Sequence, residues 1–221
     1  MSEDLDSLYR ARFDSGDLEN KARIWRILCQ DYFQRYIAAS DTVLDLACGT
    51  GEFINNIRAA DRIGVDLRTE SQSALQPDIR FVKSSATDLS ALEDGSVDVV
   101  FTSNFLEHLR TKDEMMTVLA ETRRILRPGG RFLVIGPNIR YVAGAYWDFF
   151  DHHLPLTERS LAEALHMAGF EIDLSVARFL PYSSKSRLPQ APWLVSLDLK
   201  IPLAWRFLGQ QFFVLARRHS H

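Results

Sequence analysis

The hydrophobic and polar positions of this chain follow two periods. Residues 18–38 place apolar side chains three or four positions apart, which is the spacing of an amphipathic helix. Further along, short runs next to Gly, Pro or Asp predict strands, and the apolar run at 42–47 predicts a buried one. These runs lie at 42–47, 62–66, 79–83, 97–102, 131–136, 170–176 and 212–217, with helices predicted at 52–60, 112–126 and 157–168. Strands that alternate with helices favour a parallel sheet covered on both faces.

Length and composition predict one domain rather than two. The 221 residues, of which 46% are hydrophobic, suffice for one full core. We therefore expect a single domain over residues 1–221. It carries an N-terminal helical cap at 1–39 and substrate-side insertions at 137–156 and 178–209.

The net charge and the character of the first ten residues indicate which substrates and which location to expect. The net charge of -3 and the pI near 6.1 give no basic excess, so we expect no nucleic-acid substrate. The first ten residues are acidic and polar, whereas a secretory signal needs a basic start and an apolar core. We expect a cytoplasmic protein.

A glycine-rich turn follows the first predicted strand. Gly49 and Gly51 permit a tight turn and a close approach of backbone to a ligand. Asp66 ends the second predicted strand, where a carboxylate accepts two hydrogen bonds from a ribose diol. NAD-linked oxidoreductases share both features, but Ile54 stands where their fingerprint has a third small residue.

Five segments in order carry a resemblance to a known family. They are VLDLACGTGEF (43–53), GVDL (64–67), SSATDLS (84–90), DVVFTSNFLEHL (98–109) and ILRPGGRFLVIGPN (125–138). The chain resembles the class I, Rossmann-like S-adenosylmethionine (SAM) dependent methyltransferases of the broad small-molecule group, over roughly residues 40–176. The first segment has Ala47 where that family usually has Gly. The resemblance implies an α/β fold, with a doubly wound, seven-stranded, mostly parallel sheet, helices on both faces, and a last strand antiparallel beside the fifth.

The resemblance also implies SAM as the cofactor and assigns residues to it. These are Asp45, Ala47, Gly49, Gly51, Asp66, Leu67, Asp88 and Asn104. Asp66 would hold the ribose hydroxyls, and Asp88 would accept the exocyclic amine of adenine. Leu67 would pack beside the adenine, and Asp45 would support the glycine-rich turn and the ammonium of the ligand. Asn104 would face the methionyl and sulfonium region.

Methyl transfer from a sulfonium needs alignment more than acid–base help. A base matters when the acceptor is a hydroxyl or a protonated amine, and the candidates are His108, His152 and His153. For each candidate a structural role stays open instead. Glu107 and His108 would then only line the pocket wall, and residues 151–153 would only turn the chain into the next helix. Some ubiquinone-pathway and small-RNA methyltransferases hold a metal with a Glu-x-x-Glu-His arrangement and a later His. Asn104 replaces the first Glu of that pattern here, so we expect no metal.

Two segments are expected to select the acceptor. The aromatic residues of 141–150 follow the fifth strand, and 178–209 is an unusually long connection, typical of a lid or binding element. The long connection would equally suit a helical pair or a dimer contact, and its aromatic and basic mixture would suit peripheral membrane contact through 185–209. Similar tails in bacterial methyltransferases of polysaccharide, lipid or natural-product gene sets favour a small-molecule, sugar or lipid-linked acceptor. The alternatives are a NAD-linked oxidoreductase and a SAM-binding protein without catalysis.

Overall fold

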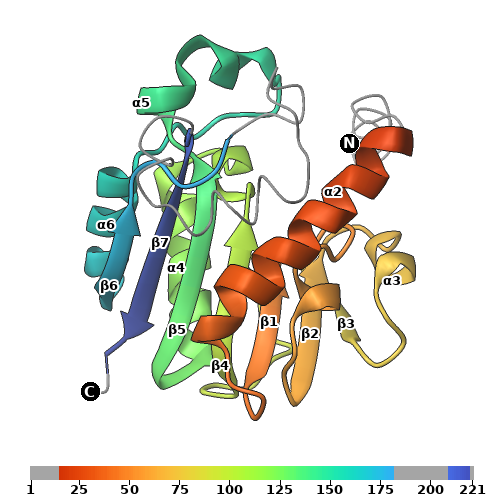
Figure 1. The fold of residues 1–221 in the computed structure, drawn as a ribbon. Coiled ribbons are helices and arrows are strands. Elements are labelled where there is room, and N and C mark those ends of the chain that lie inside the picture. The colour runs from red at the N-terminus through yellow and green to blue at the C-terminus, as the bar shows by residue number, and fades with distance from the viewer. Residues whose placement is uncertain (1–14, 182–208, 220–221) are drawn as a thin grey trace.

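The computed structural model describes residues 15–181 and 209–219, and this part of the chain folds around one seven-stranded sheet. The strands are β1 (Thr42–Leu46), β2 (Asp61–Asp66), β3 (Arg80–Lys83), β4 (Val97–Ser103), β5 (Leu126–Pro137), β6 (Phe170–Val176) and β7 (Gln211–Arg218). Their order across the sheet is β3-β2-β1-β4-β5-β7-β6. β7 runs antiparallel to β5 and β6, and the remaining pairs are parallel. The expected fold class is confirmed (Figure 1).

β1 lies at the point where the strand order reverses. It pairs with β2 on one side and with β4 on the other, and Asp45 stands opposite Gly64 and Phe101. Because the strands are parallel, the carboxyl ends of β1, β2 and β4 meet at one edge of the sheet. In open α/β sheets, this edge is where ligands bind.

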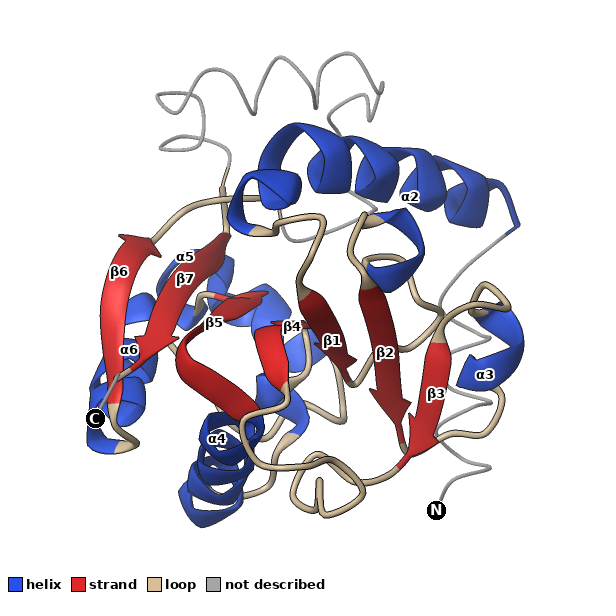
Figure 2. Ribbon diagram, turned by 90° about the horizontal axis from the view of Figure 1, so that it is seen from below, coloured by secondary structure: helices blue, strands red, loops and turns tan. Residues whose placement is uncertain are grey.

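The N-terminal helix covers one face of the sheet. α2 (Ser15–Ile27) continues into the π-helical turn η1 (Leu28–Tyr32) and the 3-10 turn η2 (Phe33–Tyr36). Figure 2 shows α2 on one side of the sheet and α4 and α6 on the other. Phe33 is fully buried, and its ring lies 5.4 Å from that of Phe101 and 5.8 Å from that of Phe213. Aromatic contacts therefore fix this segment across β4 and β7.

The helix predicted at 52–60 is wrong, because only the 3-10 turn η3 (Ile54–Asn56) forms there. Side-chain amides compete for the backbone groups of this segment. The amide Nδ2 of Asn56 donates to the carbonyl oxygen of Glu52 at 2.9 Å, the oxygen that an α-helix would offer to the Asn56 N–H. Asn55 similarly donates to the carbonyl oxygen of Ala74 at 2.9 Å.

The opposite face carries two longer helices with defined starts. α4 (Lys112–Ile125) begins at Thr111, whose hydroxyl accepts from the Glu114 N–H at 3.1 Å. α6 (Glu158–Met167) begins at Thr157 with a reciprocal capping box. The short elements α3 (Ser71–Ala74), η4 (Leu106–His108), α5 (Ile139–Val142) and η5 (Ala143–Asp148) lie in the connections.

The last two strands close onto each other next to the long connection. The Phe179 N–H donates to the carbonyl oxygen of Gln211 at 2.6 Å, and the Gln210 N–H donates to that of Leu180 at 2.7 Å. Since Gln211 pairs with Pro137 at the end of β5, these contacts lie at the carboxyl edge of the sheet. Most of the predicted 178–209 insertion, residues 182–208, falls outside the described residues.

None of the described helices is long and apolar enough to cross a membrane.

Phe33→Ala tests how much the N-terminal segment contributes to stability. Removing a fully buried Phe side chain should lower the free energy of unfolding by about 3–5 kcal/mol. Urea denaturation followed by circular dichroism measures this loss. The matched control is Phe150→Ala, because Phe150 is 91% exposed and should change stability little. Equal effects of the two substitutions would contradict the packing described here.

Candidate active site

The turn after β1 depends on left-handed backbone conformations. Ala47, Gly49 and Gly51 have φ angles of 58°, 55° and 74°. Gly tolerates such angles, whereas the Cβ of Ala makes them costly. A Cβ added to Gly49 would find only Nη2 of Arg68 within 4 Å, at 3.9 Å, so the space beside Gly49 is open. The turn therefore exposes its backbone at Gly49, at the sheet edge where ligands bind in open α/β sheets.

Asp66 joins the end of β2 to this turn. One carboxylate oxygen, Oδ2, accepts from the Gly49 N–H at 2.9 Å, and the other, Oδ1, accepts from the Arg68 N–H at 2.9 Å. The Arg68 side chain adds a contact of 3.5 Å from Nε to Oδ1. With 8% exposure, the carboxylate is held firmly next to the turn predicted from the sequence.

A second carboxyl group, Asp45, lies inside the fold below the turn. Its residue is 4% exposed, and burial, followed by the nearby charge of Glu52, raises the pKa of the Asp45 carboxyl well above its usual range. Glu52 in turn forms an ion pair with Lys21 of α2 at 2.5 Å. Lys21 was not predicted from the sequence, and it links the N-terminal helix to the candidate site.

Asn104 follows β4 with a positive φ of 50°. Its N–H donates to the Ile135 carbonyl oxygen at 3.0 Å, and its Nδ2 donates to Ser103 Oγ at 3.1 Å. Its Oδ1 is buried and has no hydrogen-bond partner among the described residues. A buried acceptor of this kind fits a ligand that brings an N–H or ammonium donor.

Two residues expected to contact an adenine are exposed to different extents. Leu67 directly follows Asp66 and is 66% exposed, which is unusual for a Leu at the end of a buried strand. Asp88 is also exposed, and its Oδ1 accepts from the Ser90 N–H at 3.1 Å. The hydrogen bonds from Ser90 lower the pKa of the Asp88 carboxyl.

Ser85 was not predicted to be a site residue, although it lies closer than Asp88 to the end of β3 along the chain. The preceding Ser84 N–H donates to the Asp66 carbonyl oxygen at 3.1 Å, which places this serine pair beside the end of β2. The Ser85 hydroxyl lies 2.7 Å from that of Thr87. The polar pair directly after a predicted strand was the signal in the sequence.

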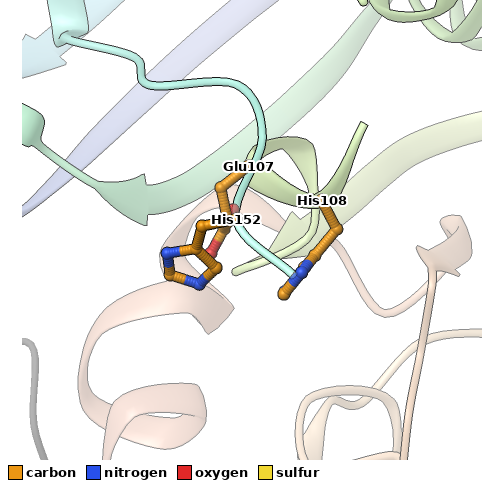
Figure 3. A group of neighbouring side chains, drawn as sticks. All are labelled: Glu107, His108 and His152. Atoms are coloured by element: carbon orange, nitrogen blue, oxygen red, sulfur yellow. The ribbon is translucent and has the colours of Figure 1, made fainter. Parts of the chain in front are cut away.

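The structure brings together two of the three histidines named as candidates. One ligand atom each of Glu107, His108 and His152 lies within 4.8 Å of the others. Figure 3 shows Glu107 and His108 coming from η4 and His152 from the segment after η5. His153 is exposed and does not join this group. Its backbone N–H donates to the Glu107 carbonyl oxygen at 2.8 Å, so its role here is to hold the segment on η4.

Burial and charge perturb the ionisable members of this group. Burial raises the pKa of Glu107 to about 7, although His108 acts to lower it. For His108, burial acts to lower the pKa, but the hydrogen bond to Asp151 and the charge of Glu107 outweigh it and raise the pKa. The Asp151 carboxylate lies 3.3 Å from His108 Nδ1. Perturbed groups that gather in this way are typical of functional sites.

The aromatic side chains of residues 141–150, the aromatic insertion, differ in burial. Tyr146 is fully buried, and its ring lies 4.6 Å from that of His152. Its hydroxyl has no hydrogen-bond partner within the described part of the chain. Trp147 and Phe150 are 60% and 91% exposed. One side of the insertion therefore packs on the histidine group and the other side faces outward.

Comparison with known proteins identifies the class of domain that this site belongs to. The profile of the family described as "Methyltransferase domain" matches residues 44–134. A probable SAM-dependent methyltransferase of Mycolicibacterium smegmatis is 32% identical over 148 residues, covering 64% of this chain and 56% of the relative. The demethylmenaquinone methyltransferase of Lactococcus lactis is 29% identical over 140 residues, covering 56% of this chain and 54% of that relative. The chain thus spans little more than half the length of these two curated relatives.

A solved structure extends the likeness to nearly the whole chain. A SAM-dependent methyltransferase from Archaeoglobus fulgidus superimposes with a TM-score of 0.63 at 22% identity, covering 87% of this chain and 94% of that protein. The chain therefore carries a methyltransferase domain with the Rossmann-like, class I fold. Over residues 44–134 the chain matches the methyltransferase domain family, and the fold and the named relatives imply SAM as the cofactor.

Ala47→Gly tests the strain in the turn after β1. Relieving a left-handed L-residue gains about 1–2 kcal/mol, of which the freedom of Gly in the unfolded chain offsets about 0.4–1 kcal/mol. Urea denaturation should therefore show a net gain of about 0.5–1 kcal/mol in the free energy of unfolding. Ala164→Gly, in the interior of α6, is the control and should lose about 0.5–1 kcal/mol. A loss of stability in Ala47→Gly would contradict the left-handed turn.

Proposed function

We propose that the protein transfers a methyl group from SAM to a small-molecule, sugar or lipid-linked acceptor. One observation carries the proposal: the Asp66 carboxylate is fixed against the Gly49 backbone at the carboxyl edge of β1 and β2, within a methyltransferase domain. SAM supplies an activated methyl group, which the acceptor takes in one in-line displacement. The protein then has to hold the two reactants in line.

The described residues fit SAM on chemical grounds. In the proposal, the backbone of Ala47, Gly49 and Gly51 faces the methionyl part, because the space beside Gly49 is open. The buried Oδ1 of Asn104 accepts from the ligand ammonium, which satisfies an acceptor otherwise left unpaired among the described residues. Asp45 supports the turn from below.

The adenosine half is proposed to lie over the ends of β2 and β3. Asp66 is the acceptor for the ribose hydroxyls, which compete with Arg68 for Oδ1. Leu67 packs beside the adenine, which explains its 66% exposure in the absence of ligand. Asp88 is the proposed acceptor for the exocyclic amine, and Ser85 is the alternative, since the N–H of its neighbour Ser84 donates to the Asp66 carbonyl oxygen.

The acceptor is proposed to approach Glu107, His108 and His152. This group lies after β4 and β5, which is the side of the sheet edge left for a second reactant once the cofactor occupies the ends of β1 and β2. His153 is not included, because its side chain is exposed. Nearby aromatic residues, with Trp147 at 60% exposure, offer a surface for an apolar or sugar-bearing acceptor.

The class of acceptor has two lines of support. One relative is named as a demethylmenaquinone methyltransferase, which supports an organic small molecule rather than a macromolecule. The net charge of -3 also disfavours a nucleic acid. Membrane contact through 185–209 was expected from the sequence, and nearly all of that stretch lies outside the described residues.

Asp66→Ala tests the ribose contact. Losing hydrogen bonds to a charged group should weaken SAM binding by about 1.5–3 kcal/mol, measured by isothermal titration calorimetry. Asp61→Ala is the matched control, because Asp61 is an exposed Asp at the other end of the same strand. A folded Asp66→Ala protein with wild-type affinity would refute the assignment.

The same titration separates the two adenine candidates. If Asp88 accepts the amine, Asp88→Asn should weaken SAM binding and Ser85→Ala should change it little. The reverse outcome assigns the contact to Ser85. Thermal unfolding of both variants shows whether a loss of affinity comes from the fold instead.

Turnover tests the reaction itself. Wild-type protein should form S-adenosylhomocysteine from SAM with at least one acceptor of a panel of phenols, quinols, sugars and lipid-linked sugars. With that acceptor, His152→Asn should lower turnover by about two to four orders of magnitude while SAM affinity stays unchanged. His166→Ala, an exposed histidine on α6, serves as the control. SAM binding with no turnover on any acceptor would favour a SAM-binding protein without catalysis.

A further inference from the structure

The imidazole of His108 has a carboxylate partner from a distant part of the chain. Asp151 follows η5, and its Oδ2 lies 3.3 Å from His108 Nδ1. The backbone carbonyl oxygen of Asp151 lies 3.0 Å from the same nitrogen. Both oxygens accept hydrogen bonds, so Nδ1 donates to Asp151 and Nε2 is left for a ligand. Catalytic sites use carboxylates in this way to fix the tautomer and orientation of an imidazole.

Main-chain hydrogen bonds hold Asp151 beside η4. The N–H groups of His153 and Leu154 both donate to the Glu107 carbonyl oxygen, at 2.8 and 3.0 Å. They fix the chain just after Asp151 against the residue that precedes His108. The Asp151 side chain is 16% exposed and that of His108 is 27% exposed. Partial burial strengthens the attraction between the two groups relative to a pair in open water.

The second histidine of this group, His152, has different neighbours. Its Nδ1 lies 3.0 Å from the Tyr146 carbonyl oxygen, which accepts a hydrogen bond but carries no full negative charge. Its ring packs against those of Tyr146 and Phe149, with centroids 4.6 and 4.9 Å apart. In its neutral form, His152 therefore presents a lone pair on Nε2.

Two carboxyl groups act on His108, one from η4 and one from the segment after η5. Burial acts to lower the pKa of His108, but the hydrogen bond to Asp151 and the charges of Glu107 and Asp151 raise it. Burial also raises the pKa of Glu107 to about 7, so Glu107 loses its proton only around neutral pH. Asp151 is therefore the more constant partner of the imidazolium form of His108.

The two rings stand close enough to act on one atom of a ligand. One ligand atom each of Glu107, His108 and His152 lies within 4.8 Å of the others (Figure 3). The rings of His108 and His152 are 5.1 Å apart between centroids. The site thus combines a ring that donates from Nε2 when protonated with a ring that accepts at Nε2 when neutral.

We propose that His108 donates a hydrogen bond from Nε2 to the oxygen of the acceptor, and that Asp151 is the residue that positions His108 and balances its charge. The role of His108 rests on the proposed methyl transfer, whereas its pairing with Asp151 does not. Because Asp151 balances the imidazolium, the pair adds no net charge that would repel the sulfonium of SAM. His152 is then the base of the site.

The proposed step moves one proton and one methyl group. The acceptor hydroxyl passes its proton to Nε2 of His152, and its oxygen keeps the hydrogen bond from His108 as negative charge develops. The C–O bond forms as the C–S bond of the sulfonium breaks, which releases S-adenosylhomocysteine with an uncharged thioether. The proton on His152 then passes to solvent.

This arrangement selects an oxygen acceptor over a nitrogen acceptor. A hydroxyl oxygen has two lone pairs, so it accepts from His108 with one and attacks the methyl group with the other. A neutral amine has a single lone pair, which the hydrogen bond from His108 would occupy. A protonated amine would instead meet the imidazolium as a like charge. The acceptor is accordingly an alcohol, phenol or quinol.

Nuclear magnetic resonance tests the pair without any acceptor. The Cε1–H signal of His108 in the full-length protein, assigned by its loss in His108→Leu, is followed across pH. Asp151→Asn keeps the size of the side chain and the backbone carbonyl but removes the charge, so His108 should titrate at a lower pH than in wild type. Asp148→Asn, an exposed aspartate of η5, is the matched control and should leave the titration where it is. An unmoved titration in Asp151→Asn would overturn the proposal.

Acceptor kinetics test the hydrogen bond itself. With a hydroxyl acceptor that wild type methylates, His108→Leu should lower kcat by about 10²–10³-fold at unchanged SAM affinity, as loss of a donor to a developing oxyanion does. His108 donates as a cation only below its pKa, so kcat/KM of wild type should fall as the pH rises through that pKa. In Asp151→Asn this fall should begin at a lower pH, which a merely structural role of Asp151 would not produce.

Paired acceptors test the chemical class. Of a phenol and the aniline of the same skeleton, only the phenol should be methylated. Comparable rates for both, or wild-type kcat in His108→Leu, would refute the hydrogen bond to the acceptor while leaving methyl transfer in place. Lack of turnover on every acceptor would refute the proposed function and the role of His108 together. The titration of His108 then still decides whether Asp151 is its partner.

Discussion

The position of β1 between β2 and β4 is the constraint on which the rest of the structure depends. Parallel strands on both sides bring the end of β1 next to Asp66 and next to Asn104. The chain must then leave β1 in a tight turn, which uses left-handed angles at Ala47, Gly49 and Gly51. The hydrogen bond from Gly49 to Asp66 locks this turn to the neighbouring strand. Strand order thus brings together the residues that are proposed to bind the cofactor.

The second half of the site depends on a different interaction. The carbonyl oxygen of Glu107 accepts from two successive N–H groups, those of His153 and Leu154. Main-chain bonds therefore dock the aromatic insertion onto η4, and side chains from both segments share one buried place. Neither half of the site lies on a long helix. Both lie on short connections held by a rigid sheet, which is the usual location of binding residues.

The sequence predicts the strands of the sheet better than the helices and connections around it. The strand at 170–176 is found with its observed bounds, because its apolar and polar residues alternate as they do in an edge strand with one buried face. The segment at 52–60 misleads because its apolar residues have helical spacing, while Asn56 takes the carbonyl that a helix would use. In the site, Asp66 is predictable because the ends of adjacent parallel strands must meet. The meeting of His152 with Glu107 is not predictable, because it depends on hydrogen bonds between segments far apart in the chain.

The closure of β6 against β7 has a consequence for divergence among related proteins. The hydrogen bonds between Phe179 and Gln211 and between Leu180 and Gln210 join the segment that leaves β6 to the segment that enters β7. Loop closure costs only about 0.6 kcal/mol more for each doubling of loop length. Evolution can therefore lengthen, shorten or exchange residues 182–208 at small entropic cost while the described sheet keeps its register. Under the proposed function, acceptor choice and cofactor binding are then separately inheritable properties of one scaffold.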